Sequence, residues 1–72
     1  MKSSEKKRNT IMSAAVRNGI DSVNILADMT YISRSTLHRK LKAPETLTIA
    51  EIRQIDHKVH FTDDEVKVLI RG

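Results

Sequence analysis

Apolar residues recur every three to four positions along most of the chain, as they do on one face of an α-helix. No stretch alternates between apolar and polar residues in the way that is typical of a half-buried strand. The pattern predicts helices over residues 5–18, 21–29, 34–41, 48–57 and 63–70. We therefore expect an all-α domain of five helices.

Two of these helices begin with complete N-terminal signals. Thr48 and Glu51 have the spacing of a capping box, in which each side chain bonds the backbone of the other residue, and Thr62 and Glu65 repeat that spacing. Apolar residues flank both boxes in the positions of a hydrophobic staple, namely Leu47 with Ile52 and Phe61 with Val66. These signals set the starts of the fourth and fifth helices.

Other local signals bound the remaining helices. We expect Asp21 to cap the second helix, with Ile20 packing on Ile25 as a staple. Gly19 supplies a left-handed residue that ends the first helix. Pro44 ends the third, because the residue before a proline is disfavoured in helical geometry. The predicted core consists of apolar residues within these helices and directly beside them: Ile11, Ala15, Leu26, Ala27, Ile32, Leu37, Leu41, Leu47, Ile52, Ile55, Phe61, Val66 and Leu69.

The length of 72 residues leaves room for one domain, 1–72, in which we expect residues 1–4 to be flexible and the polar run 2–8 to be partly disordered. The chain has no cysteine, which excludes a disulfide framework and a thiolate zinc site. His57 and His60 span a predicted helix end, so we expect no metal site there. No segment resembles a signal peptide or a membrane span, and we expect a cytoplasmic protein.

The sequence offers no arrangement that is typical of an enzyme. It has no nucleophile with an adjacent base, no glycine-rich phosphate loop and no metal triad. The paired acids Asp63 and Asp64 instead fit the N-terminus of the fifth helix, where negative charge is favourable. We therefore expect a binding protein without catalytic activity, cofactor or small-molecule ligand.

The 13 Lys and Arg residues exceed the 9 Asp and Glu residues, and the resulting net charge of +4 favours polyanionic partners. Residues 1–19 carry five basic groups and one acid, residues 20–47 four and three, and residues 48–72 four and five. The positive charge is thus concentrated in the first two thirds of the chain. Its basic run at residues 6–8 is an arm around DNA, a set of phosphate contacts from the first helix, or a solubilising terminus.

Residues 26–41 have the pattern of a helix-turn-helix, two short helices joined by a tight turn. Ala27 is small enough for the helices to cross closely, and Ser33 is the expected cap of the second helix of the pair. The exposed start of that helix and the basic edge after it present groups that bond base edges and phosphates. The candidate DNA-binding residues are Ser33, Arg34, Ser35, Thr36, His38, Arg39, Lys40 and Lys42.

The segment 32–39, Ile-Ser-Arg-Ser-Thr-Leu-His-Arg, resembles the helix-turn-helix of phage repressors and Cro proteins. The order of five helices, with the motif on the second and third, is similar to the lambda-repressor-type domain over almost the whole chain. Two positions depart from that pattern, because Tyr31 replaces the usual glycine of the turn and Thr30 replaces an apolar residue. The single-domain chain also resembles the Cro-like modulator-of-repression (Mor) proteins of lactococcal temperate phages.

The resemblance implies a phage-encoded transcription regulator that opposes the phage CI repressor in the lytic/lysogenic switch inside the bacterial host cell. Its implied partners are duplex operator DNA and the N-terminal domain of the repressor, and a homodimer on a palindromic operator is one possibility. The first hypothesis is operator binding. The alternative is an antirepressor that binds the repressor directly. The candidate residues for that interface are Asp28, Tyr31, Arg34, Glu51, Asp63, Asp64 and Glu65.

Overall fold

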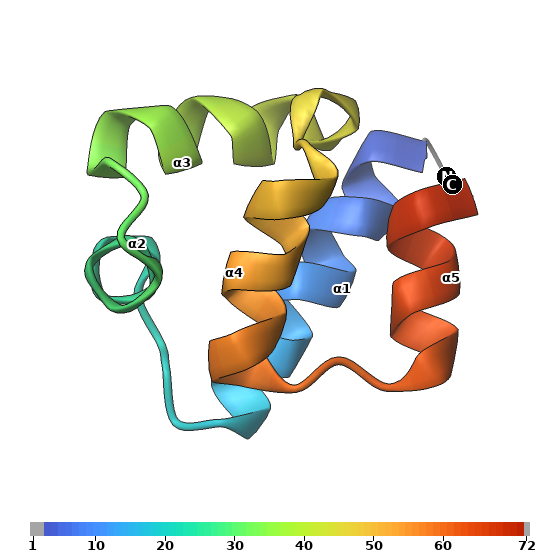
Figure 1. Ribbon diagram of the computed structural model, residues 1–72, viewed down its shortest axis with the longest axis horizontal. Helices are drawn as coiled ribbons and strands as arrows, with labels where there is room; N and C mark the ends of the chain where they lie inside the picture. Colours follow the sequence, from blue (N-terminus) through green and yellow to red (C-terminus); the bar gives the residue numbers. More distant parts are fainter. Residues whose placement is uncertain (1–2, 72) are drawn as a thin grey trace.

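Five α-helices and a short 3₁₀ helix make up the computed structural model, which describes residues 3–71 (Figure 1). The elements are α1 (Ser3–Arg17), α2 (Val23–Thr30), α3 (Arg34–Lys42), η1 (Pro44–Thr46), α4 (Ile49–Val59) and α5 (Asp63–Arg71). Because no strand occurs within these residues, the predicted all-helical class is confirmed. None of the described helices is long and apolar enough to cross a membrane.

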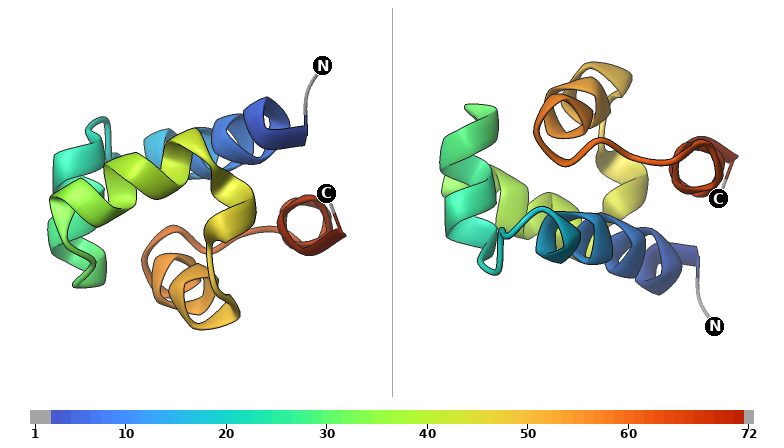
Figure 2. Two further views of the ribbon diagram at one scale, coloured as in Figure 1. Left: turned by 90° about the horizontal axis from the view of Figure 1, so that it is seen from above. Right: turned by 90° about the horizontal axis from the view of Figure 1, so that it is seen from below.

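The helices surround the core with α3 across one end. α1 and α5 pack side by side, and α3 lies across the end of the molecule at which α4 begins (Figure 1). α2 contacts both α3 and α4. Seen from that end, α1 lies behind α3 on one side and α4 on the other (Figure 2). Because α1, α2 and η1 cover only the inner side of α3, the outer side of this helix is open to solvent.

The core lies where α1, α2, α3 and α4 converge. Ile11, Leu26, Leu37 and Ile55 are fully buried, one from each of these helices. Burying a side chain of this size stabilises the fold by roughly 1.5–3 kcal/mol. Most of the predicted core is confirmed, but four of its members are only partly buried: Leu47, Ile52, Phe61 and Val66. The core also contains residues outside the predicted set: Ala14, Ile20 and Val59.

Both predicted capping boxes are present. Thr48 Oγ1 accepts a hydrogen bond from the Glu51 N–H at 3.1 Å, and Glu51 Oε1 accepts one from the Thr48 N–H at 2.9 Å. At α5, the corresponding bonds between Thr62 and Glu65 measure 3.2 and 2.8 Å. These reciprocal bonds satisfy backbone amides that have no partner inside the helix.

The prediction that Asp21 caps α2 is wrong by one residue. Ser22 is the cap, and its Oγ accepts a hydrogen bond from the Asn24 N–H at 3.2 Å. The shift also removes the predicted staple, because Ile20 is buried in the core while Ile25 is 47% exposed.

Several helix ends differ by a residue or two from their predicted positions. α1 begins at Ser3, so the polar run at 2–8 is helical from that residue, while residues 1 and 2 lie outside the described part of the chain. Gly19 has a φ of +79°, which fits its predicted role at the end of α1. α4 extends to Val59, and His60 follows it with a φ of 51°.

Candidate functional site

The turn between α2 and α3 consists of Tyr31, Ile32 and Ser33. The backbone N–H groups of Tyr31 and Ile32 both bond the carbonyl oxygen of Ala27, the second of them at 3.2 Å. Ala27 is fully buried, as expected of a small residue where two helices cross closely. These bonds and the buried crossing fix the position of α3 relative to α2.

Tyr31 has a left-handed backbone, with a φ of 61°. This conformation costs an L-residue roughly 1–2 kcal/mol, because its Cβ approaches the following carbonyl oxygen. The side chain is 87% exposed, so packing within the domain does not offset that cost. Non-glycine residues held in this conformation cluster at functional sites.

Thr30, the residue before the turn, is buried with its hydroxyl satisfied. Its Oγ1 bonds the carbonyl oxygens of Leu26 at 2.8 Å and Ala27 at 3.2 Å. Thr30 is therefore buried without leaving an unpaired donor, at a position where the resemblance implies an apolar residue.

The hydroxyl residues at the start of α3 serve the helix itself. Ser33 Oγ accepts a hydrogen bond from the Thr36 N–H at 3.3 Å, which confirms Ser33 as the cap. The Oγ atoms of Ser33 and Ser35 lie 3.1 Å apart. Thr36 is half-buried, whereas Ser33 and Ser35 are exposed.

Arg34, the first residue of α3, forms a two-point ion pair with Asp28 on α2. Its Nε donates to Asp28 Oδ1 at 3.0 Å and its Nη2 to Oδ2 at 2.6 Å. Hydrogen bonds from the guanidinium lower the pKa of Asp28, and the carboxylate raises the pKa of Arg34. Both side chains are more than half exposed. The pair thus bridges the two helices at the molecular surface.

Lys40 is paired as well, on the inner side of α3. Its Nζ donates to Glu51 Oε1 at 2.5 Å, and both side chains are less than one fifth exposed. Burial raises the pKa of Glu51, but the hydrogen bonds from Lys40 and Thr48 outweigh it and leave the pKa below its usual value. This pair joins α3 to the capping box of α4. Lys40 and Glu51 are therefore not free for DNA or a partner protein, in contrast to the prediction from the sequence.

Three more candidates lie on the exposed side of α3. His38 Nε2 is 2.9 Å from Asn24 Oδ1 on α2. Arg39 and Lys42 are exposed and make no side-chain hydrogen bond or ion pair with any residue that the structure describes. The start of α1, with its basic run at 6–8, lies near the end of α3 (Figure 2). We call Arg39, Lys42, Lys7 and Arg8 the basic edge.

An exposed apolar strip runs along α2 into the turn that precedes α3. It consists of Ile25 and Met29, one turn apart on α2, together with Tyr31 in the turn. Ile25 is 47% and Met29 39% exposed. The Asp28–Arg34 pair lies in the same region of the chain. This combination of apolar and paired charged groups differs from the basic edge.

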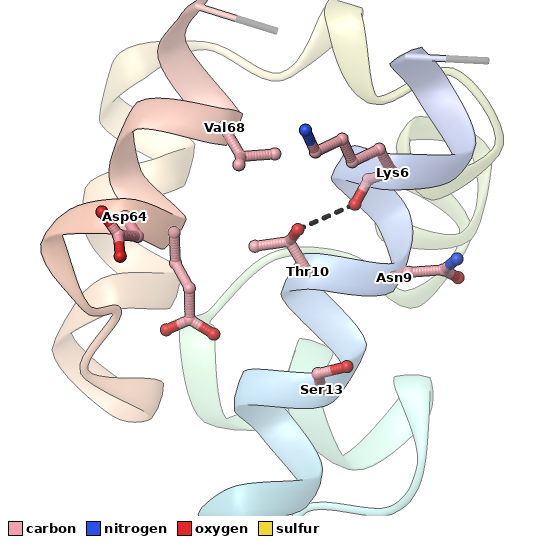
Figure 3. Close-up of a pocket in the computed structure, with 7 residues that line it drawn as sticks. Lys6, Asn9, Thr10, Ser13, Asp64 and Val68 are labelled. Carbon is pink, nitrogen blue, oxygen red and sulfur yellow. Dashed lines mark hydrogen bonds between the residues drawn. The ribbon is translucent and has the colours of Figure 1, made fainter. Parts of the chain in front are cut away.

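The acidic candidates of α5 lie elsewhere. Glu65 accepts bonds from both terminal nitrogens of Arg17 on α1, at 3.1 and 2.9 Å. These bonds, followed by that from the Thr62 N–H, lower the pKa of Glu65 to about 2. Asp63 and Asp64 occupy the first turn of α5, and Asp64 lines an open groove of about 380 Å³ against α1 (Figure 3). Lys6 also lines this groove.

A second groove lies between α4 and α5. It has a volume of about 260 Å³ and is lined by Ile49, Ile52, Arg53, Asp56, Phe61, Val66 and Ile70. The half-buried state of several predicted core residues is explained by this groove, which leaves their outer sides open. Within residues 3–71, no three His, Cys, Asp or Glu side chains are grouped so as to hold a metal ion.

The sequence therefore identified most of the exposed groups on α3 but none of their partners. Asp28 and Arg34 are six residues apart, and His38 and Asn24 fourteen, so no helical spacing links them. Their pairing depends on the angle between α2 and α3. Comparisons of the chain with protein-family models, with curated proteins and with solved structures found no match.

Proposed function

We propose that α2, the turn and α3 form a helix-turn-helix that binds duplex DNA, within a domain of the lambda-repressor type. The observation that carries this proposal is the exposed outer side of α3, which starts at a capped N-terminus and bears Arg34, Ser35, His38 and Arg39. In such motifs the N-terminal part of the second helix enters the major groove and contacts base edges. No cofactor or catalytic step is part of this function.

The basic edge supplies the second part of a DNA interface. Phosphate contacts position a protein on the duplex, while base contacts give specificity. Arg39 and Lys42 have no partner in the described part of the chain. Lys7 and Arg8 continue the positive charge onto α1, whereas Lys6 lines the groove between α1 and α5. Together with the resemblance to Cro proteins, this supports a cytoplasmic, phage-encoded regulator that opposes a CI-type repressor at its operators.

The apolar strip favours a second candidate function, direct binding to the repressor. Ile25, Met29 and Tyr31 gain nothing against a charged phosphate backbone, but exposed aromatic and Met side chains are frequent at protein interfaces. Arg34 is already paired by Asp28, and Lys40 by Glu51, which leaves α3 less basic than its sequence suggests. An antirepressor of this kind covers the DNA-reading surface of its partner.

One experiment separates the two candidates. The purified chain is incubated with a pool of DNA duplexes whose central segment is randomised, and the bound fraction is sequenced. Its binding to the N-terminal domain of the CI-type repressor is measured in parallel by calorimetry. Operator binding predicts an enriched sequence whose affinity falls steeply between about 50 and 200 mM salt. Heat only with the repressor domain, and no enrichment, would favour the antirepressor instead.

A further inference from the structure

We infer that Asp28 is a positioning residue, which holds the Arg34 guanidinium so that its outer edge reads a base. The inference rests on the proposed DNA-binding function and deepens it. It starts from the two bonds of the pair, Nε to Oδ1 at 3.0 Å and Nη2 to Oδ2 at 2.6 Å.

The donors that Asp28 occupies lie on one edge of the guanidinium. Arginine has five N–H donors in a planar fork, and Asp28 takes the Nε hydrogen and one Nη2 hydrogen. The end of the fork has one hydrogen on Nη1 and one on Nη2, and both of these donors stay free to bond a base. Within the described residues, Arg34 bonds to nothing else. Two parallel donors in this geometry match the O6 and N7 acceptors of guanine.

Stability alone gives little reason for the pair. Exposed ion pairs contribute little to folding, because water screens them and two long side chains lose freedom. Both side chains are more than half exposed. An acid beside a DNA-binding helix also repels phosphates, so Asp28 weakens general binding. These costs are explained if Asp28 fixes the orientation of Arg34 at the first position of α3.

The chain offers a matched control for the charge of Asp28. Asp21 precedes α2, is exposed and makes no side-chain hydrogen bond with the residues that the structure describes. Asp21→Ala removes the same charge from the other end of α2 without touching Arg34. Asp28→Asn keeps the size of the side chain but cannot accept both bonds, because its amide nitrogen is a donor.

The test measures base preference with the randomised duplex pool for the wild type, Asp28→Ala, Asp28→Asn, Asp21→Ala, Arg34→Ala and the double variant Asp28→Ala/Arg34→Ala. We expect the wild type to prefer guanine at one position, and Arg34→Ala to lose about tenfold discrimination there. Both Asp28 variants should lose about fivefold or more at that position. Their affinity for a mixed-sequence duplex should be unchanged or higher, as for Asp21→Ala, which keeps the preference.

Two outcomes would overturn the inference while leaving the proposed function intact. If Asp28→Ala raises the affinity for preferred and mixed duplexes equally, Asp28 only competes with DNA for Arg34 and does not orient it. If Asp28→Ala still reduces discrimination in the Arg34→Ala background, Asp28 does not act through Arg34. A wild type without any base preference would instead remove the proposed function, and the inference with it. Thermal melts of every variant confirm that the folded fraction is unchanged.

Discussion

At the scale of single residues, Tyr31 and His60 adopt a left-handed backbone conformation, which favours glycine. Tyr31 ends α2 with a φ of 61°, and His60 ends α4 with a φ of 51°. Both side chains are exposed, so neither gains buried contacts in return. Tyr31 lies beside the proposed DNA-reading helix, whereas His60 lies at the far end of α4 from η1 (Figure 1).

We expect Tyr31→Gly and His60→Gly each to raise the free energy of unfolding by up to about 1 kcal/mol, because glycine adopts positive φ without the steric cost. Chemical denaturation measures the change. His60→Gly is the matched control for partner binding, since it relieves the same strain away from the apolar strip. Loss of stability in Tyr31→Gly would show that the exposed ring makes stabilising contacts.

Some of these residue-scale features could not be predicted from the sequence. The left-handed backbone of Tyr31 was not predictable from the residue type, because a tyrosine replaces the glycine that the family resemblance implies at this turn. Nor was the Asp28–Arg34 pair, since it forms only when the turn has set α3 against α2. The same holds for Lys40 and Glu51, which the sequence assigned to two different partners and the structure joins to each other.

At the scale of helices, the residues of the first turn predict best where a helix begins. The capping boxes of α4 and α5 were predictable because each depends on residues three apart. The start of α2 was not, because Asp21 and Ser22 are both good caps and only packing selects between them. Burial of Ile20 in the core accompanies the later start.

We expect Thr48→Ala and Thr62→Ala each to cost about 1 kcal/mol, because each removes the acceptor for an orphan amide. In a domain of this size the melting temperature should fall by roughly 4–8 °C. Ser13→Ala is the control, since it removes an exposed hydroxyl in the middle of α1, where no cap is needed. A melting temperature that is unchanged in both threonine variants would contradict the role of the boxes.

At the scale of the whole molecule, the periodicity predicted the number and order of the helices but not the closeness of their packing. Phe61 and Val66 are predicted as a staple pair and as core residues, yet they line the open groove between α4 and α5. Hydrophobic period identifies the face of a helix that turns inward, and it does not report whether the neighbouring helix covers that face fully. α1 and α5 are in contact and are joined by the ion pair between Arg17 and Glu65, which we call the clamp.

This clamp makes the stability of the domain dependent on pH. The pKa of Glu65 is lowered from 4.5 to about 2 in the folded protein, first by the bonds from Arg17 and then by the Thr62 N–H. Because the folded pKa is depressed, the folded state is favoured above the unfolded value near 4.5. That stabilisation is lost as the pH falls toward about 2.

We therefore expect the melting temperature of the wild type to exceed that of Glu65→Gln at neutral pH, and the difference to shrink between about pH 5 and pH 2. The amide of the Glu65→Gln variant keeps an oxygen that accepts the Thr62 N–H but carries no charge for Arg17 to bind. The lowered pKa values of Asp28 and Glu51 affect both proteins alike, so they cancel in the difference. Thermal melts across this range measure it, with Arg17→Met as a second variant that breaks the clamp from α1. A difference that stays constant with pH would mean that Glu65 acts through its size and capping bond, and not through its charge.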